Sequence, residues 1–290
     1  MTRHSERAAN PPQRRRLRRV AASLGTTALL AAAAACSTAR LSSGEKSARV
    51  LVYNIHAGKD AKGVDNLERV AALVDSLKAD IVLLQEVDRN TTRSGRVDQP
   101  ATLARLTGLN AAFGNSLDFQ GGEYGIAILS RWPISSDTTV RLPVVPPQAR
   151  SGGSYEPRAA LRVIIDTPAG PLAVVNTHLD PTGDDHWRRQ EIRTVLAIVA
   201  SLRSRGVPTF MGGDLNSTPE SATQDTVRAA GLRDAWTTCG NGDGLTYPAD
   251  SSTKRIDYLY LSGSATCTRA LVVRTDASDH RPLFVHVRNW

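Results

Sequence analysis

The sequence predicts an α/β (α+β) fold in which helices cover the outer faces of mixed sheets. It also predicts a single domain after the N-terminal region. Short apolar segments recur along the chain and are typical of buried strands. Segments with helical spacing separate some of them, and a turn-rich tetrapeptide joins two others as a hairpin. Strand–helix–strand units mixed with hairpins favour mixed sheets covered by helices.

The first half of the chain predicts three strands and a helix. The apolar strands span residues 49–55, 81–86 and 125–130, and Trp132-Pro133 follows the third. A helix is expected over residues 64–78, because Leu67, Val70, Val74 and Leu77 repeat at helical spacing.

The second half predicts a hairpin, a long helix and four further strands. Strands 159–166 and 172–177 flank the turn Thr167–Gly170, and the Pro/Gly-rich stretch 143–157 before them is expected to be a surface loop. The helix is expected over 185–202. The remaining strands are expected over 208–212, 256–261, 270–274 and 282–287.

The N-terminal region has the composition of a secretory signal. Residues 1–19 contain seven arginines, and an alanine-rich apolar stretch follows up to Ala35. That stretch is about 16 residues long, shorter than the ~20 that a membrane helix needs. We therefore expect export, with residues 1–35 as the signal, 36–48 as a tether and 49–290 as the domain.

The end of the predicted signal leaves two alternatives open. Three alanines precede Cys36, which resembles the lipobox of bacterial lipoproteins, although Ala33 stands where that motif usually has leucine. Lipid attachment at Cys36 would place the protein on the cell surface, whereas plain cleavage would secrete it.

The predicted signal carries most of the net positive charge. The whole chain has a formal net charge of +8, but residues 1–35 hold seven of its 36 Lys and Arg and one of its 28 Asp and Glu. The remaining 29 basic and 27 acidic residues give a net charge of +2. This balance lends no support to a nucleic-acid partner. We expect a monomer.

Two cysteines remain once Cys36 is set aside. In an oxidising compartment Cys239 and Cys267 would form a disulfide, and two buried free thiols are the alternative.

Polar residues suited to phosphate and metal chemistry fall at the ends of the predicted strands, where a scaffold presents side chains to a pocket. They are Asn54, Glu86, His178, Asp214, Asn216, Asp257, Asp279 and His280. Mg²⁺ prefers oxygen ligands and needs only one or two carboxylates, so Glu86, with Asn54 beside it, is the best ligand candidate. Asp214 and His280 could align and deprotonate an attacking water, Asp257 could orient His280, and His178 and Asn216 could donate to phosphate.

Six short motifs in order along the chain resemble those of the endonuclease/exonuclease/phosphatase superfamily. They are Tyr53-Asn54-Ile55, Leu84-Gln85-Glu86, Asn176-Thr177-His178-Leu179, Gly213-Asp214-Leu215-Asn216, Arg255-Ile256-Asp257-Tyr258 and Ser278-Asp279-His280. The resemblance covers residues 49–287 and implies a DNase I-like four-layer α/β/β/α sandwich, with the site at one end of its two packed sheets.

The resemblance also implies roles for single residues. Glu86, Asn54 and Asp279 would bind one or two Mg²⁺ or Mn²⁺ ions, and Asp214, Asp257, His280 and His178 would be the catalytic set. Asn216, His178, Arg158 and Tyr124 would contact the substrate phosphate. Ile126 departs from the pattern, because the family usually has Asn there.

These observations predict an exported, divalent-metal-dependent phosphoester hydrolase, most plausibly a phosphodiesterase acting on a lipid head group or a small phosphoester. An extracellular nuclease of the DNase I-like type is the alternative within the same chemistry. A catalytically inactive surface binding protein on the same fold is the alternative from another class.

Overall fold

Alternation along the central strands sorts their side chains onto two faces. The computed structural model describes residues 46–144 and 155–290. In β1 (Ser47–Asn54), Val50 and Val52 join one hydrophobic cluster, whereas Leu51 and Tyr53 join another. Successive residues of a strand point to opposite faces, so this sheet is buried on both sides.

The strands form two six-stranded mixed sheets. The first runs β11 (Thr266–Val272), β12 (Leu283–Arg288), β1, β2 (Ile81–Arg89), β4 (Gly122–Ser130) and β3 (Asn110–Phe119). The second runs β5 (Ile134–Arg141), β6 (Ala159–Thr167), β7 (Gly170–His178), β8 (Thr209–Asp214), β10 (Asp257–Leu261) and β9 (Arg233–Asp234). Each sheet has one parallel pair, β1 with β2 and β7 with β8.

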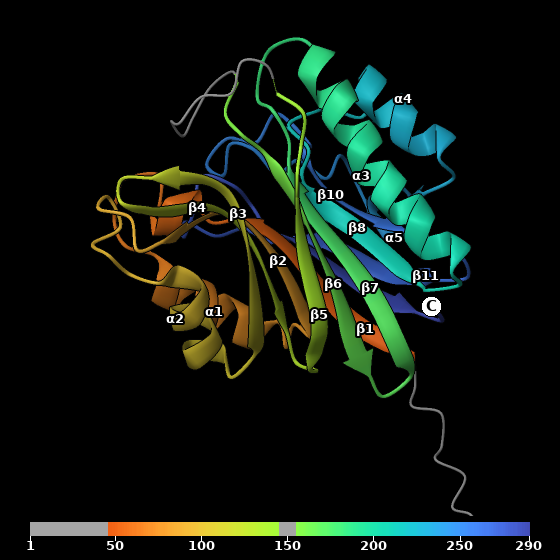
Figure 1. The fold of residues 1–290 in the computed structure, drawn as a ribbon, viewed down its shortest axis with the longest axis horizontal. Helices are drawn as coiled ribbons and strands as arrows, with labels where there is room; N and C mark the ends of the chain where they lie inside the picture. Colours follow the sequence, from red (N-terminus) through yellow and green to blue (C-terminus); the bar gives the residue numbers. More distant parts are fainter. Residues whose placement is uncertain (1–45, 145–154) are drawn as a thin grey trace, which may run out of the picture. The chain divides into compact units, whose positions relative to one another are not determined.

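Helices cover the outer faces of both sheets (Figure 1). They are α1 (Leu67–Ser76) and α2 (Gln99–Thr107) on the first sheet, and α3 (His186–Ser204) and α4 (Ala222–Ala229) on the second. The short helix α5 (Ala235–Cys239) instead contributes Ala235 and Trp236 to the central core, and a 3-10 helix, η1 (His56–Gly58), follows β1. Val70 and Leu103 of α1 and α2 pack on the first sheet, and Val195 and Val227 of α3 and α4 pack on the second. A third cluster fills the space between the sheets. This four-layer arrangement confirms the predicted fold class.

Most predicted elements are present, but the sequence did not predict strands β3, β5 and β9, helices α2, α4 and α5, or the 3-10 helix η1. β3 and β5 are the edge strands of their sheets, and β5 is largely exposed and polar, so it lacks the apolar pattern of a buried strand. The helix α2 is only nine residues long, with Asp98 capping its start and Gly108 ending it in the left-handed region.

Three predictions fall partly or wholly outside the described residues: the signal, the lipid attachment at Cys36 and most of the loop 143–157. The predicted tether 36–48 ends too late, because β1 already begins at Ser47. Within the described part of the chain, no helix is long and apolar enough to cross a membrane.

A disulfide joins Cys239, the last residue of α5, to Cys267 in β11, with Cα atoms 5.8 Å apart. The alternative of two free thiols is therefore wrong. Closing a loop with a sequence separation of 28 is worth about 3 kcal/mol on the loop-entropy estimate.

Candidate active site

Strand register brings the predicted catalytic residues to one edge of the second sheet. Asp214 ends β8 and lies opposite His178 of parallel β7 and opposite Asp257 of antiparallel β10. Asn54 ends β1 in the other sheet, and its Nδ2 donates to Asp214 Oδ2 at 3.1 Å. The ends of the two packed sheets therefore meet at Asp214.

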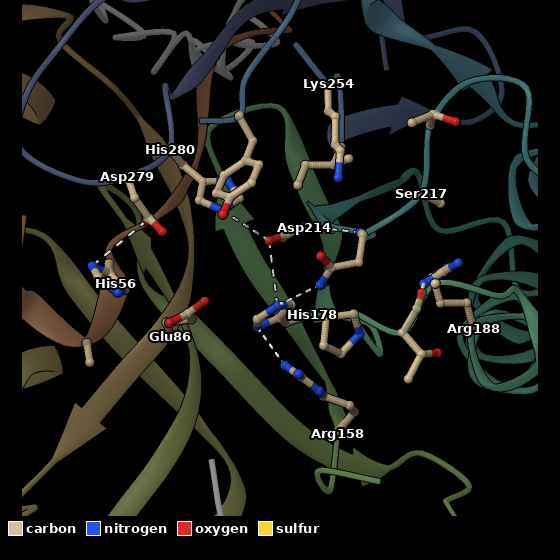
Figure 2. A pocket seen from close by; sticks show the side chains of 18 of the residues that line it. His56, Glu86, Arg158, His178, Arg188, Asp214, Ser217, Lys254, Asp279 and His280 are labelled. Atoms are coloured by element: carbon tan, nitrogen blue, oxygen red, sulfur yellow. Dashed lines mark hydrogen bonds and ion pairs between the residues drawn. The ribbon is translucent and has the colours of Figure 1, made fainter. Parts of the chain in front are cut away.

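A bulge in β2 aims Glu86 at the same point. Leu84 pairs with Ala127 and Val87 with Gly125, so Gln85 and Glu86 together lie opposite a single residue of β4. Glu86 has a φ of 53°, in the left-handed region. Its Oε1 accepts a hydrogen bond from Asn54 Nδ2 at 2.9 Å, and Figure 2 shows its carboxylate inside the pocket.

The Asp214 carboxylate lies between two histidines. Its Oδ2 is 3.5 Å from His178 Nε2 and 3.6 Å from His280 Nε2, and its Oδ1 accepts from the backbone N–H of Asn216 at 2.9 Å. Burial raises the pKa of Asp214, and the charge of Asp257 raises it further. A carboxylate with a raised pKa is a better proton acceptor than an ordinary one.

His280 is held between carboxylates. Its Nδ1 is 2.9 Å from Asp257 Oδ2, and the Tyr247 ring packs on its imidazole with centroids 4.8 Å apart. Burial opposes a charge on His280, but Asp257 and Asp214 outweigh it and raise the pKa of the imidazole. The site therefore favours the positively charged form of His280 beside Asp214.

His178 is in the opposite electrostatic situation. Arg158 Nη1 lies 2.9 Å from its Nδ1, and Asn216 Nδ2 lies 3.0 Å from its Nε2. Burial lowers the pKa of His178 well below its usual range, and the charges of Arg158 and His280 lower it further. The site therefore holds one neutral and one charged histidine.

These residues surround a pocket of about 910 Å³. Eight of the ten predicted site residues line it, namely Glu86, Tyr124, Arg158, His178, Asp214, Asn216, Asp279 and His280. Asn54 and Asp257 are completely buried behind this wall, where they contact Asp214 and His280. Ile126 belongs to the central core cluster, so no polar group stands there.

The pocket also has lining residues that the sequence did not single out. They are, among others, His56, Lys59, Arg93, Arg188, Tyr247 and Lys254. His56 follows Asn54 by two residues, and its Nδ1 lies 4.0 Å from Asp279 Oδ1. Tyr247 and Lys254 face each other in a backbone bridge. Only His56 and Lys254 had a signal in the sequence, because they lie two and three residues from Asn54 and Asp257.

Two of the predicted metal ligands offer carboxylate oxygens to the pocket. Glu86 and Asp279 both line it, and the Asp279 side chain is 26% exposed. Carboxylate oxygens open to a pocket are what Mg²⁺ and Mn²⁺ require. Asn54 presents Nδ2 to Glu86, while its Oδ1 accepts from the backbone N–H of His56, so a direct metal bond from Asn54 stays a prediction.

A second group could also hold an ion. Ligand atoms of Asp214, Asp257 and His280 lie within 4.8 Å of one another, and all three residues are buried. The hydrogen bond between Asp257 and His280 already commits Nδ1 of the imidazole. These residues fit Mg²⁺ less well than Glu86 and Asp279, because imidazole nitrogen suits transition metals better.

Known proteins resemble this chain over most of its length. The uncharacterized protein YbhP of Escherichia coli (strain K12) is 29% identical over 254 residues, which is 83% of this chain and 96% of YbhP. An endonuclease/exonuclease/phosphatase of Beutenbergia cavernae matches with a TM-score of 0.69 and 26% identity, over 84% of this chain and 72% of that one.

A mannosyl-6-phosphatase of Bacteroides thetaiotaomicron shares the fold, with a TM-score of 0.69 and 20% identity, over 83% of this chain and all of its own. The family model described as Endonuclease/Exonuclease/phosphatase family matches residues 51–280, which include every predicted site residue. On that match, and with the predicted site residues gathered in or directly behind one pocket, the chain belongs to the endonuclease/exonuclease/phosphatase family.

Proposed function

We propose that this protein is an exported, Mg²⁺- or Mn²⁺-dependent phosphodiesterase that hydrolyses a lipid head group or another small phosphoester. The observation that carries the proposal is the position of Asp214 Oδ2, which lies 3.5 Å from one imidazole nitrogen and 3.6 Å from another. Members of the family hydrolyse phosphoester bonds, and this arrangement supplies the groups that such a reaction needs.

Asp214 is assigned as the group that aligns the attacking water and accepts its proton at Oδ2. His280 is less suited to accept that proton, because Asp257 and Asp214 favour its charged form. The water oxygen forms the new bond to phosphorus, and the ester P–O bond opposite it breaks. His280, with a proton on Nε2, stabilises the charge that develops on the phosphoryl oxygens.

We assign two further donors, Asn216 Nδ2 and His178 Nε2, to the phosphoryl group. Asn216 Nδ2 lies 3.0 Å from His178 Nε2 and also donates to Leu179 O at 2.9 Å. Preorganised donors lower the cost of charge development, because they do not have to rearrange during the reaction. Glu86 and Asp279 would hold the metal, which would supply Lewis-acid stabilisation of the phosphate and leaving-group charge.

The charges around the pocket favour a small substrate over a nucleic acid. Four of its lysines and arginines are already paired with carboxylates: Arg93 with Asp88, Arg158 with Glu156, Arg188 with Asp185 and Lys59 with Asp65. Within residues 46–144 and 155–290, Lys254 is the one lining cation without an ion pair, and Figure 2 shows it extending into the pocket. Such a site offers little uncompensated charge to a polyanion.

A substrate panel tests the proposal. Purified protein should hydrolyse an activated aryl phosphodiester with Mg²⁺ or Mn²⁺, and His280→Ala should abolish this activity. His286→Ala is the matched control and should leave the rate unchanged. His286 of β12 lies opposite Arg49 in the backbone register of β1, five residues before Asn54 at the end of that strand.

The panel should then include sphingomyelin, inositol phospholipids, mannose 6-phosphate, DNA and RNA. Faster turnover of DNA or RNA than of every small ester would establish the nuclease alternative. Rates equal to those of His280→Ala with every metal and substrate would establish the inactive binding protein instead.

A further inference from the structure

A buried row of side chains leads from Glu156 through Arg158 to His178. Glu156 is 0% exposed, Arg158 3% and His178 5%. Arg158 Nη1 lies 3.0 Å from Glu156 Oε1 and 2.9 Å from His178 Nδ1. The hairpin register aligns Ala160 with Thr177, which places Arg158 beside the end of β7.

The chemistry of arginine decides how His178 carries its proton. A guanidinium has five N–H donors and no acceptor, so His178 Nδ1 must be the acceptor of this hydrogen bond. A neutral imidazole carries one proton, which must then be on Nε2. The doubly protonated ring is excluded by the same contact, because Nδ1 would then point a proton at a cation.

Asn216 favours the opposite tautomer. Its Nδ2 is anchored to Leu179 O at 2.9 Å and lies 3.0 Å from His178 Nε2. If Arg158 were absent, that amide could donate to an unprotonated Nε2, and the imidazole proton would move to Nδ1. Hydrogen bonds from charged donors are roughly twice as strong as neutral ones, so Arg158 prevails over Asn216.

The position of this proton decides what the His178 ring presents to the pocket. With a proton on Nε2, His178 and Asn216 present two converging donors, and Asp214 Oδ2 lies 3.5 Å from Nε2. A phosphoryl oxygen would satisfy both donors. With the proton on Nδ1, the Nε2 lone pair would face that oxygen and repel it.

We propose that Arg158, held by Glu156, is a positioning residue that fixes His178 as the neutral Nε2–H tautomer. Figure 2 shows His178 between Arg158 and Asp214. The consequence for catalysis rests on the proposed function, whereas the tautomer itself does not. Arg158 therefore acts on the substrate through His178.

The test is the ¹⁵N NMR spectrum of ¹⁵N-histidine-labelled protein without substrate, with the His178 ring assigned by its loss in His178→Gln. Wild type should show a protonated Nε2 and an unprotonated Nδ1. Arg158→Met should move the proton to Nδ1, and Arg158→Lys, which keeps a donor-only cation, should retain it on Nε2. A wild-type His178 protonated on Nδ1, or on both nitrogens, would overturn the proposal.

A double variant separates an effect on the tautomer from a failure to fold. Arg158→Met leaves a buried carboxylate without its partner, so Glu156→Gln with Arg158→Met should fold where the single variant fails and should show the same proton shift. An unchanged Nε2–H ring in either folded variant would also refute the role of Arg158. If the enzyme is active, Arg158→Met should lower kcat about 10- to 100-fold, the range found when the hydrogen-bond partner of a metal-bound histidine is lost, with Arg158→Lys closer to wild type. Inactive wild type with the predicted tautomer would refute only the proposed function.

Discussion

The two histidines of the site differ in charge because their neighbours differ, although both rings face the same Asp214 oxygen. Asp257 holds His280 at 2.9 Å, whereas Arg158 holds His178 at 2.9 Å. A carboxylate partner favours imidazolium and a guanidinium partner favours neutral imidazole. In the proposed reaction, this difference would place a charged and a neutral donor at a single phosphoryl group.

Replacing Asp257 by Asn tests the charged member of this pair. Asp257→Asn removes the negative charge that stabilises imidazolium at His280, while the shape of the side chain is kept. We expect kcat to fall by about 10²- to 10⁴-fold, the usual range for acid–base groups. The half-saturating Mg²⁺ concentration should stay nearly constant, because Asp257 is completely buried behind the pocket wall. A large rise in that concentration would instead identify Asp257 as a metal ligand.

At the scale of strands, the site depends on how closely β7 and β8 approach. Gly213 has a φ of 135°, and a Cβ there would fall on the carbonyl oxygen of Thr177 in the neighbouring strand. Only glycine combines this backbone conformation with that contact. The close pairing of β7 and β8 therefore requires glycine at position 213, directly before Asp214.

Gly213→Ala should therefore destabilise the protein. The added methyl group cannot be accommodated without separating β7 from β8, and we expect a loss of more than about 2 kcal/mol in the free energy of unfolding. Urea unfolding monitored by circular dichroism measures it. Gly183→Ala is the matched control, because nothing lies within 4 Å of a Cβ at Gly183, and it should change stability by less than about 1 kcal/mol. Equal losses in the two variants would contradict the argument.

The same elements show how far the sequence could predict the fold. The central strands were predictable because burial on both faces makes them continuously apolar, as in the segment from Val50 to Tyr53. β5 was not, because an edge strand with one exposed face needs no such pattern. The motif residues were predictable because strand ends carry them. Lys254 and Tyr247 were not, because long-range packing of their loop brings them to the pocket.

Across the whole molecule, the buried layers contain more ionisable groups than the proposed reaction uses. Glu191, on the buried face of α3, is 0% exposed, and its Oε2 accepts from the backbone N–H of Asp180 at 2.8 Å. Its Oε1 is buried without a hydrogen-bond partner among the described residues. Burial raises the pKa of Glu191 to about 7, against the opposing hydrogen bond from Asp180. The packing of α3 on the second sheet therefore favours the protonated carboxyl.

This burial predicts a pH-dependent stability. The unfolded carboxyl has a pKa near 4.3, so between about pH 4.3 and pH 7 the folded chain binds a proton that the unfolded chain releases. The free energy of unfolding should therefore fall as pH rises through this window and remain low above it. Glu191→Gln cannot ionise, and its amide can still accept from Asp180.

Urea unfolding at pH 5 and pH 8 should reveal the contribution of Glu191. Wild type should lose roughly 1–3 kcal/mol more stability between these pH values than Glu191→Gln does. Glu156, whose pKa burial also raises to about 7, acts in both proteins and cancels in the comparison. Glu220→Gln, at an exposed position, should behave as wild type. If Glu191→Gln loses as much stability as wild type, the carboxyl of Glu191 is already ionised at pH 5 and the helix packs over a charged group.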